Sequence, residues 1–406
     1  MTLTKDSSFT VTARKYRPQT FDAVISQAHV TRTLRNALAS GRQAHAYLFS
    51  GPRGVGKTTL ARLLAKGLHC EKAPTGDPCN VCEGCRAIGE ARSLDYQEID
   101  GASNRGIDQI RELNASLGFA SPNQKHRVFV IDEVHMLTTE AFNALLKSLE
   151  EPPPKVLFVF CTTEVHKVPI TIRSRCQHYV FKAFSLGQIR DQLAAILKDE
   201  AIEVEDEALF LIARAANGSM RDGQSLLDQA VAYAGDRLTA DSAREVLGLA
   251  AGEGPMEFLA NLAGGKLDGN QALLRSTLLG GTDAKQFFLE IVRLLNALVF
   301  IKSGIVDGER LELSSRDLEG LLACQERFAV GEIFTLLDLC HDLLRELRRA
   351  GDERVLLDFY LIKLHRYRTL VTPEQLKAEL DKLQGGGTGE GTAPATPRAP
   401  EPASQP

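Results

Sequence analysis

Residues 51–58 read GPRGVGKT and have the types and spacing of a loop that binds phosphate groups, G-x-x-x-x-G-K-[ST]. Their three glycines allow backbone torsions that side chains would block, so several N–H groups can converge on phosphate oxygens. The lysine would reach the β- and γ-phosphates, and the threonine hydroxyl would ligate Mg²⁺. We therefore predict an ATP site whose contacts come from Gly51, Pro52, Arg53, Gly54, Val55, Gly56, Lys57, Thr58 and Thr59.

The apolar run VFVID (128–132) ends in a pair of acidic residues, Asp132 and Glu133. At the end of a strand, the first carboxylate can hold a metal ion while the second activates an attacking water molecule. Such a pair is commonly a solvated turn when it stands alone. Because this one follows a phosphate loop in an alternating α/β region, we predict that Asp132 binds Mg²⁺ and that Glu133 is the general base.

Four clustered cysteines follow the helix predicted behind the phosphate loop, with the spacing C-x8-C-x2-C-x2-C. Four soft thiolate ligands in a compact shell suit tetrahedral Zn²⁺, and they leave no open coordination position. The predicted zinc is therefore structural; an iron–sulfur centre and unliganded cysteines are the alternatives. The proposed ligands are Cys70, Cys79, Cys82 and Cys85, whereas Cys161, Cys176, Cys324 and Cys340 stand in apolar stretches and are expected to be small core residues.

Three further polar residues are weaker candidates when the residues are considered alone. Thr163 follows the apolar run VLFVFC (156–161) and would put a hydroxyl near the γ-phosphate, although TTE also fits an ordinary turn. Arg175 ends a short helix-like segment, and Arg221 stands at the start of a helix. A lone arginine is usually a surface partner in a salt bridge.

Apolar runs of strand length alternate with helical patterns up to about residue 181. AYLFS (46–50), VFVID and VLFVFC are each followed by turn residues or a helix. This alternation predicts an α/β fold, a parallel sheet with helices on both faces. Ligands of such sheets bind at the carboxyl ends of the strands, where the motifs above stand.

The rest of the chain is expected to be helical, with no further strand. Amphipathic patterns over 188–200, 206–216, 219–234 and 240–249 predict a small helical domain, and a Gly-rich hinge follows at 248–255. Longer helices with wide apolar stripes are predicted over 286–301, 330–349 and 353–367, as a bundle that buries surface against partner chains. From residue 385 the Gly/Pro/Ala/Thr composition predicts a disordered tail or linker.

Composition limits the class of protein. The 406 residues are 44% hydrophobic and 25% charged with a net charge of −4, as in a soluble globular protein of two or three domains. No overall basic field indicates nucleic-acid binding, so a DNA contact would need a local patch or a ring of subunits. No signal peptide pattern or membrane-spanning apolar run stands out, and we expect a cytoplasmic location without a membrane partner.

Together these motifs resemble the gamma/tau subunit of bacterial DNA polymerase III, the AAA+ ATPase of the sliding-clamp loader. The matching stretches are ARKYRPQTF (13–21), AYLFSGPRGVGKTTLARLLAKGLHC (46–70) with the cysteine cluster, IDEVHML (131–137), FNALLKSLEEPP (142–153), TTEVHKVPITIRSRC (162–176) and GSMRDGQSLLDQA (218–230). They cover about the first 245 residues densely. The resemblance implies an AAA+ domain over residues 1–182 with a zinc loop at 70–85, a helical lid over 183–247, a helical collar for oligomerisation over 248–372, and a helix end and tail over 373–406.

The resemblance also implies roles for single residues. Tyr16, Arg17 and Pro18 would contact the base and ribose, and Thr163 is similar in place to sensor 1. Arg175 in the SRC triplet resembles the arginine finger, which would act on ATP held by the neighbouring subunit. Arg221 resembles sensor 2 on the lid. The stretch 102–111 stands where related loaders touch DNA phosphates.

As a whole, the resemblance implies an ATP hydrolase that loads the sliding clamp on primed DNA during replication. It would work within the DNA polymerase III holoenzyme, a DNA-directed DNA polymerase complex, without a polymerase active site of its own. Expected partners are the delta and delta prime subunits, copies of the same chain, the clamp and primed DNA, with the polymerase core if a longer form exists. The competing interpretations are an AAA+ helicase or branch migrator, and a scaffold for which ATP is a structural ligand.

The sequence departs from the family pattern at two positions. Ser26 stands where the family usually has glycine before Gln27, and Gly223 stands where alanine is usual. Neither position belongs to the phosphate chemistry.

Overall fold

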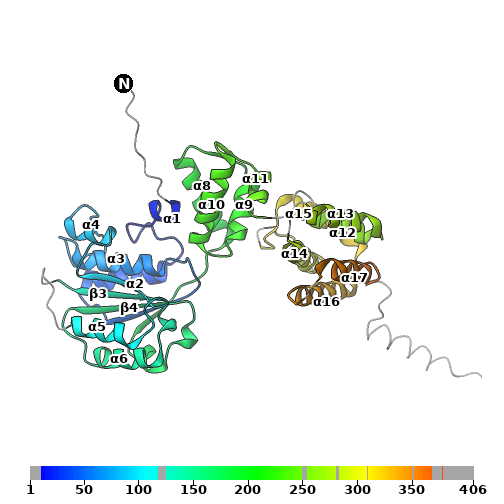
Figure 1. Ribbon diagram of the computed structural model, residues 1–406. Coiled ribbons are helices and arrows are strands. Elements are labelled where there is room, and N and C mark those ends of the chain that lie inside the picture. The colour runs from blue at the N-terminus through cyan, green and yellow to red at the C-terminus, as the bar shows by residue number, and fades with distance from the viewer. Residues whose placement is uncertain are drawn as a thin grey trace, which may run out of the picture. The chain divides into compact units, whose positions relative to one another are not determined.

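A computed structural model of the protein describes residues 11–117, 125–248, 254–279, 283–308, 310–349, 352–367 and 377. The chain divides into two compact units (Figure 1). The first comprises residues 1–252 with 307–315, and the second comprises 253–306 with 316–406. The predicted tail and most of the predicted hinge lie outside the described residues.

A five-stranded parallel sheet forms the centre of the first unit, with the order β2-β3-β4-β1-β5. Its strands are β1 (Ala46–Ser50), β2 (Tyr96–Asp100), β3 (Arg127–Asp132), β4 (Val156–Thr162) and β5 (Gln177–Val180). Because β1 lies between β4 and β5, the loop that leaves β1 lies near the carboxyl ends of β4 and β3. Parallel sheets bind ligands at the carboxyl ends of their strands.

Helices cover both faces of this sheet, as predicted (Figure 1). Successive strand residues point to opposite faces, so Tyr47 and Phe49 pack in one core and Ala46 and Leu48 in the other. The helices and 3-10 turns of this part are α1 (Thr12–Lys15), α2 (Ala28–Ser40), α3 (Lys57–His69), α4 (Glu83–Gly89), α5 (Ile107–Leu117), η1 (Val134–Met136), α6 (Thr139–Glu150), η2 (Val165–Lys167) and α7 (Ile170–Arg173). Helices α2 and α3 share the first core, and α5 and α6 share the second.

The three strands predicted from apolar runs are confirmed within one residue at each end. They are the three inner strands, buried on both faces, and so they read as continuous apolar runs. Sequence analysis did not predict β2 and β5, which are the two edge strands and are largely polar and exposed. Edge strands of this kind carry a weaker apolar signal.

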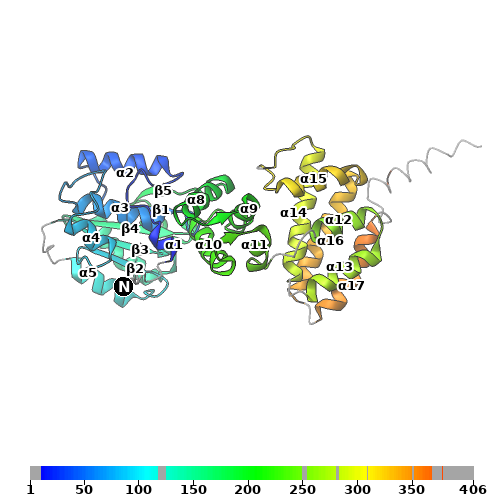
Figure 2. The same ribbon diagram turned by 90° about the horizontal axis from the view of Figure 1, so that it is seen from above.

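Four helices complete the first unit: α8 (Leu186–Asp199), α9 (Asp206–Ala215), α10 (Met220–Ala234) and α11 (Ala240–Val246) (Figure 2). They share one apolar core, and the side chains of Ser185, Ser219 and Thr239 cap the N-termini of α8, α10 and α11. The expectation of no strand after residue 181 is wrong in detail. Two short strands, β6 (Glu203–Val204) and β7 (Arg237–Leu238), pair in parallel between these helices.

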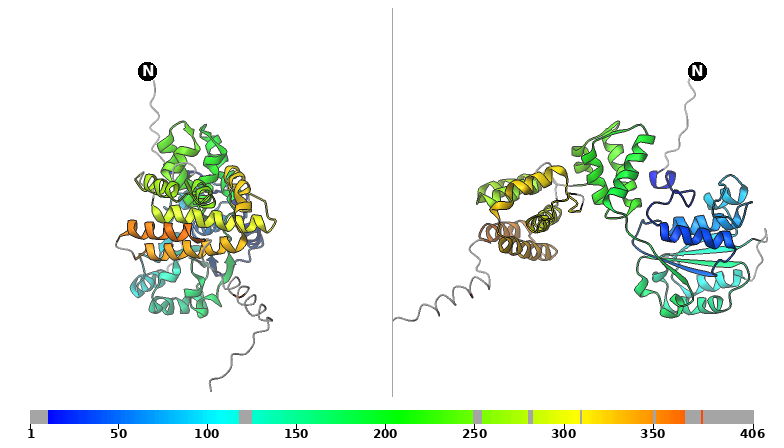
Figure 3. Two further views of the ribbon diagram at one scale, coloured as in Figure 1. Left: turned by 90° about the vertical axis from the view of Figure 1, so that its right-hand side faces the viewer. Right: turned by 180° about the vertical axis from the view of Figure 1, so that it is seen from behind.

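The described residues of the second unit form helices joined by short connections, coloured yellow-green to orange in Figure 3. Its elements are α12 (Gly254–Ala263), α13 (Leu267–Leu279), α14 (Ala284–Lys302), α15 (Ser315–Cys324), η3 (Gln325–Arg327), α16 (Val330–Leu347) and α17 (Glu353–His365). Phe258, Phe287 and Phe288 pack edge to face in its core. Phe300, Phe334 and Phe359 are about half exposed, at 50%, 52% and 52%.

The scattered cysteines lie in apolar surroundings, as predicted. Cys161, Cys324 and Cys340 are buried and Cys176 is half-buried. None of the helices in the described part of the chain is long and apolar enough to cross a membrane.

Candidate nucleotide site and cysteine cluster

The phosphate loop connects the end of β1 to the start of α3. Gly54 and Gly56 have positive φ angles of 73° and 98°, the region that a glycine enters without a steric penalty. Gly51 must also be glycine, because a Cβ there would lie 2.4 Å from the carbonyl oxygen of Phe181. Since α3 begins at Lys57, the loop leads directly into a helix N-terminus, which favours anions.

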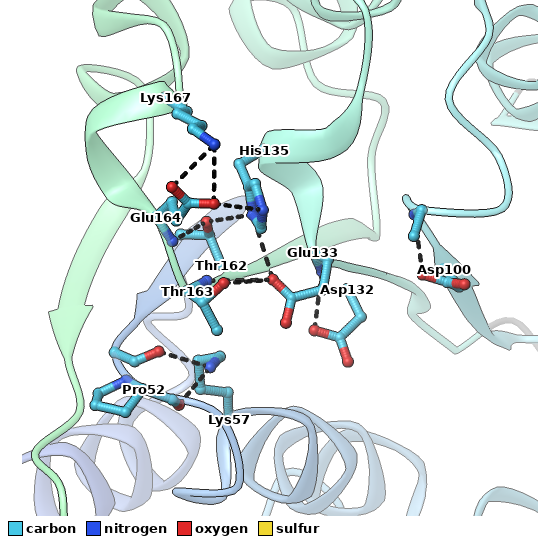
Figure 4. A network of polar contacts seen from close by, with 12 residues as sticks. Pro52, Lys57, Asp100, Asp132, Glu133, His135, Thr162, Thr163, Glu164 and Lys167 are labelled. Atoms are coloured by element: carbon cyan, nitrogen blue, oxygen red, sulfur yellow. Dashed lines mark hydrogen bonds and ion pairs between the residues drawn. The ribbon is translucent and has the colours of Figure 1, made fainter. Parts of the chain in front are cut away.

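Lys57 is buried beneath this loop, and its Nζ donates to the carbonyl oxygens of Gly51 and Pro52, each at 2.7 Å (Figure 4). Burial lowers the pKa of the Lys57 ammonium, and the carboxylates of Asp132 and Glu133 act in the opposite direction. The ammonium thus lies between the loop and the acidic pair, where a phosphate group would compete for its three donors.

Thr58 and Asp132 come together at the carboxyl ends of the strands, although they are 74 residues apart. The Thr58 hydroxyl donates to Asp132 Oδ2 at 3.1 Å. A hydroxyl beside a carboxylate supplies two oxygen ligands of the kind Mg²⁺ prefers. The structure therefore unites the two residues predicted to hold the metal ion.

Glu133 has a left-handed backbone, with a φ angle of 45° that is uncommon for a residue other than glycine. Its backbone N–H donates to Asp132 Oδ1 at 2.9 Å. Its own carboxylate accepts from the Thr163 hydroxyl at 2.9 Å and from the Thr163 N–H at 3.3 Å. Thr163, the residue directly after β4, therefore fixes the orientation of the predicted general base (Figure 4).

His135 joins this network, and sequence analysis missed it. Its imidazole is only 6% exposed, and Nδ1 lies 3.2 Å from Glu133 Oε2 and 3.0 Å from the Thr162 hydroxyl. Nε2 lies 3.3 Å from Glu164 Oε1, which also pairs with Lys167 (Figure 4). The available signal was the histidine two residues after the acidic pair in IDEVH, because the turn η1 brings it back beside Glu133.

The N-terminus of α10 touches the phosphate loop. A Cβ built on Gly54 would lie 2.0 Å from the Ser219 hydroxyl and 3.2 Å from Arg221 Cβ. Burial is the main cause that lowers the pKa of the Arg17 guanidinium, the positive charge of Arg62 lowers it further, and the charge of Arg221 makes a smaller contribution in the same direction. Arg221, the second residue of α10, therefore lies directly beside the predicted phosphate site.

The three residues predicted to contact the base take two different places. Tyr16 packs against the core of α8–α11, and its hydroxyl donates to Glu200 Oε1 at 2.8 Å. Arg17 and Pro18 instead line a small cavity beside α3 with Gln19, Thr59, Arg62, Leu63, Lys66 and Gly89. Their role as base and ribose contacts stays a prediction.

Arg175 lies near the amino ends of the strands, opposite the carboxyl ends where the phosphate loop lies. It stands between α7 and the start of β5, and β5 runs parallel to β1, so it is at the amino end of the strands. Its guanidinium donates to the Thr171 carbonyl at 2.7 Å and pairs with Glu150, the last residue of α6, which also lies near the amino ends of the strands. The five residues of β1 separate Arg175 from the phosphate loop by about 15 Å.

The four clustered cysteines converge as predicted. Their Sγ atoms all lie within 4.8 Å of one another, close to the spacing of about 3.8 Å that a tetrahedral Zn–S₄ site requires. Backbone N–H groups point at the sulfurs: Cys79 N–H donates to Cys70 Sγ and Cys82 N–H to Cys79 Sγ, each at 3.4 Å. Hydrogen bonds from the backbone of Cys82 and Val81 lower the pKa of the Cys79 thiol to about 6, whereas burial raises the pKa of Cys85.

Glycines allow the cysteine cluster to sit close to α3. A Cβ on Gly84 would lie 2.4 Å from the His69 carbonyl oxygen, and one on Gly67 would lie 2.6 Å from the Thr75 carbonyl oxygen. Both contacts are with backbone, which cannot move aside as a flexible side chain could. The cluster is therefore fixed against the same helix that begins at the phosphate loop.

The two departures from the family pattern have local structural consequences. Ser26 has a φ angle of 69°, the left-handed region where glycine is favoured. A Cβ on Gly223 would lie 3.1 Å from Ile189 Cγ2 and 3.2 Å from Ala216 Cβ, so an alanine there would be tightly packed.

Comparison with known families covers nearly the whole described chain. Residues 26–185 match the family described as DNA polymerase III, delta subunit, and residues 188–236 match the DNA polymerase III clamp loader subunit, ATPase lid domain. Residues 238–380 match DNA polymerase III subunits gamma and tau domain III. The chain is 38% identical over 299 residues to DNA polymerase III subunit gamma of Buchnera aphidicola, covering 73% of this chain and 82% of that protein. The chain belongs to the gamma/tau family of DNA polymerase III subunits.

Longer members of the gamma/tau family are also similar. DNA polymerase III subunit tau of Bacillus subtilis is 36% identical over 366 residues, which are 88% of this chain and 63% of that protein. The tau subunit of Escherichia coli is 42% identical over 315 residues, which are 77% of this chain and 49% of that protein. The chain thus spans about half to two thirds of the length of these two relatives.

Proposed function

We propose that this chain is an ATP hydrolase subunit of a clamp loader, which couples ATP binding and hydrolysis to the loading of a sliding clamp on primed DNA. The proposal rests on one observation: five predicted site residues converge at the carboxyl ends of the strands. These residues are Lys57, Thr58, Asp132, Glu133 and Thr163. Membership of the gamma/tau family supports the replicative role.

Within this proposal each side chain has a defined task. Backbone N–H groups of residues 53–58 and the Lys57 ammonium bind the phosphates, and Thr58 and Asp132 would hold Mg²⁺, which would supply positive charge beside the β- and γ-phosphates. Glu133, oriented by Thr163, accepts a proton from the attacking water. Arg221, at the start of α10, contacts phosphate oxygens from the lid side.

Arg175 acts in trans in this proposal. It lies at the amino ends of the strands, whereas the phosphate loop of the same chain lies at their carboxyl ends. An arginine there is directed at the ATP of a neighbouring subunit, so turnover depends on assembly. The half-exposed phenylalanines of α14, α16 and α17 are proposed to bury surface against such neighbours.

The cysteine cluster fits structural zinc. Four sulfur donors within 4.8 Å of one another, each in reach of the others, match a closed tetrahedral shell. Three of the four cysteines are buried and none is disulfide-bonded. We therefore assign Cys70, Cys79, Cys82 and Cys85 as zinc ligands.

The partners in this proposal are the delta and delta prime subunits, copies of the chain, the clamp and primed DNA, and the polymerase core where a longer form exists, all in the cytoplasm. The chain contributes ATP hydrolysis to the polymerase holoenzyme. Arg105, in the turn after β2, is the proposed DNA contact within residues 102–111; its Nε donates to the Ala102 carbonyl at 2.9 Å.

The test is ATP turnover and clamp loading by the reconstituted loader with clamp and primed DNA. Lys57→Met should abolish both, whereas Lys147→Met, an exposed lysine on α6, should preserve them as a matched control. Unchanged turnover in Lys57→Met would refute the proposal. Normal loader assembly without any turnover in the native chain would favour the scaffold.

A further inference from the structure

The loop that carries the cysteines, here called the cysteine loop (residues 70–85), contacts the N-terminal segment (residues 16–22) through a buried lysine. Lys66, on α3, donates from Nζ to Gln19 Oε1 at 2.6 Å and to Asn80 Oδ1 at 2.9 Å. Asn80 Nδ2 donates in turn to the Gln19 carbonyl at 3.0 Å. Helix, segment and loop are thus joined in one closed set of hydrogen bonds.

The contact contains a buried charge, because Lys66 is only 3% exposed. A buried ammonium needs acceptors for its donors, and here both acceptors are neutral amide oxygens. Loss of either Gln19 or Asn80 would leave a donor of a buried charge without its partner, which is costly. The amine therefore holds both amides in place.

The cysteine loop in turn determines where Asn80 lies. Asn80 stands between Cys79 and Cys82 and has a φ angle of 59°, a left-handed conformation that asparagine tolerates. The backbone N–H groups of Cys79 and Cys82 donate to cluster sulfurs on either side of it. Closure of the thiolate cluster therefore fixes the turn that presents the Asn80 amide.

A second bridge joins the same two parts of the chain. Arg35, on α2, pairs through one guanidinium nitrogen with Asp22 of the segment and through the other with Asp77 of the loop. Exposed ion pairs of this kind are individually weak. Their geometry nevertheless agrees with the buried contact, because one side chain reaches both the segment and the loop.

We propose that the metal-closed cysteine loop is a positioning element for nucleotide binding. Through Lys66 and Asn80 it holds Gln19, and thereby Arg17 and Pro18, against α3 beside Thr59. The proposal rests on the proposed function and on the prediction that Arg17 and Pro18 contact the base and ribose of the nucleotide. Zinc occupancy and nucleotide affinity are thus coupled within one chain.

The experiment measures three quantities on the full chain: the Kd of a fluorescent ATP analogue, zinc content by elemental analysis, and hydrogen exchange of residues 16–22. Lys66→Met should keep its zinc, bind the analogue about tenfold more weakly, and exchange faster in the segment. Gln19→Ala, which removes the acceptor of the segment and leaves Lys66 in place, should act in the same direction. Lys147→Met is the matched control.

Zinc extraction distinguishes coupling from a general loss of stability. Removing zinc from the native chain should weaken binding to a similar extent, and removing it from Lys66→Met should add little, because both changes break the same link. Unchanged affinity after extraction, or fully additive losses, would overturn the inference while leaving ATP binding itself intact. A native chain that does not bind the analogue would instead overturn the proposed function.

Discussion

Replacing Thr163 by valine isolates the contact that orients the general base. The side chain keeps its shape and its β-branch, but it loses the hydroxyl that donates to Glu133 Oε2 at 2.9 Å. The remaining donor from Thr163, its backbone N–H at 3.3 Å, is unaffected by the change. The Glu133 carboxylate would therefore keep the longer of these two hydrogen bonds and lose the shorter one, so its orientation would be less well fixed.

The size of the effect follows from the strength of one hydrogen bond to a charged acceptor, about 1.5–3 kcal/mol. The Glu133 side chain is 31% exposed, so solvent competes and the lower end of this range applies. A loss of about 1.5 kcal/mol corresponds to a roughly tenfold lower kcat. Because Thr163 orients a base and does not bind the ground-state nucleotide, KM should change little.

The assay is steady-state ATP turnover by the reconstituted loader with clamp and primed DNA, together with the Kd of an ATP analogue. Thr139→Val, at an exposed threonine in the first turn of α6, is the matched control. A kcat equal to or above that of the native protein would refute the argument. It would mean that the contact restrains Glu133 instead of aligning it.

Three further outcomes are expected. Arg175→Ala should lower turnover of the assembled loader by about 10³-fold or more, without changing the Kd for ATP of the isolated chain, and an equal loss of both would contradict action in trans. Gly54→Ala should weaken ATP binding, measured by titration, because a Cβ would fall 2.0 Å from the Ser219 hydroxyl at a φ angle of 73°; native affinity would show that α10 moves away freely. Cys79→Ser should lower zinc content and Tm together, since binding energy of a structural metal is folding energy, and full zinc content in this variant would exclude Cys79 as a ligand.

The inner part of the fold could be predicted because its signals are local. The strands β1, β3 and β4 are buried on both faces, so their apolar runs stand out in the sequence. The edge strands β2 and β5 pair on one side only and expose most of their side chains, and their sequences, YQEID and QHYV, carry no such signal. The pair β6 and β7 has two residues in each strand, too few for any periodicity.

The network around Glu133 shows the same limit at the site. Asp132 and Glu133 were found because they are adjacent and end an apolar run. His135 was missed because its partners Thr162 and Glu164 belong to another strand end, about 30 residues away in the sequence. A histidine after an acidic pair indicates nothing specific until the neighbouring strand is known.

The sequence by itself determined the phosphate loop and the cysteine cluster, because each needs residue types at fixed short spacings and little else. The tertiary structure decided which distant residues meet these motifs: Thr58 meets Asp132, and Lys66 joins Gln19 to Asn80. It also decided that Arg175 lies at the amino ends of the strands, opposite the carboxyl ends where the phosphate loop lies. The physical reason is that parallel strands pair only through crossovers of a dozen or more residues, so the neighbours of a strand end are set by sheet order and not by the adjacent sequence.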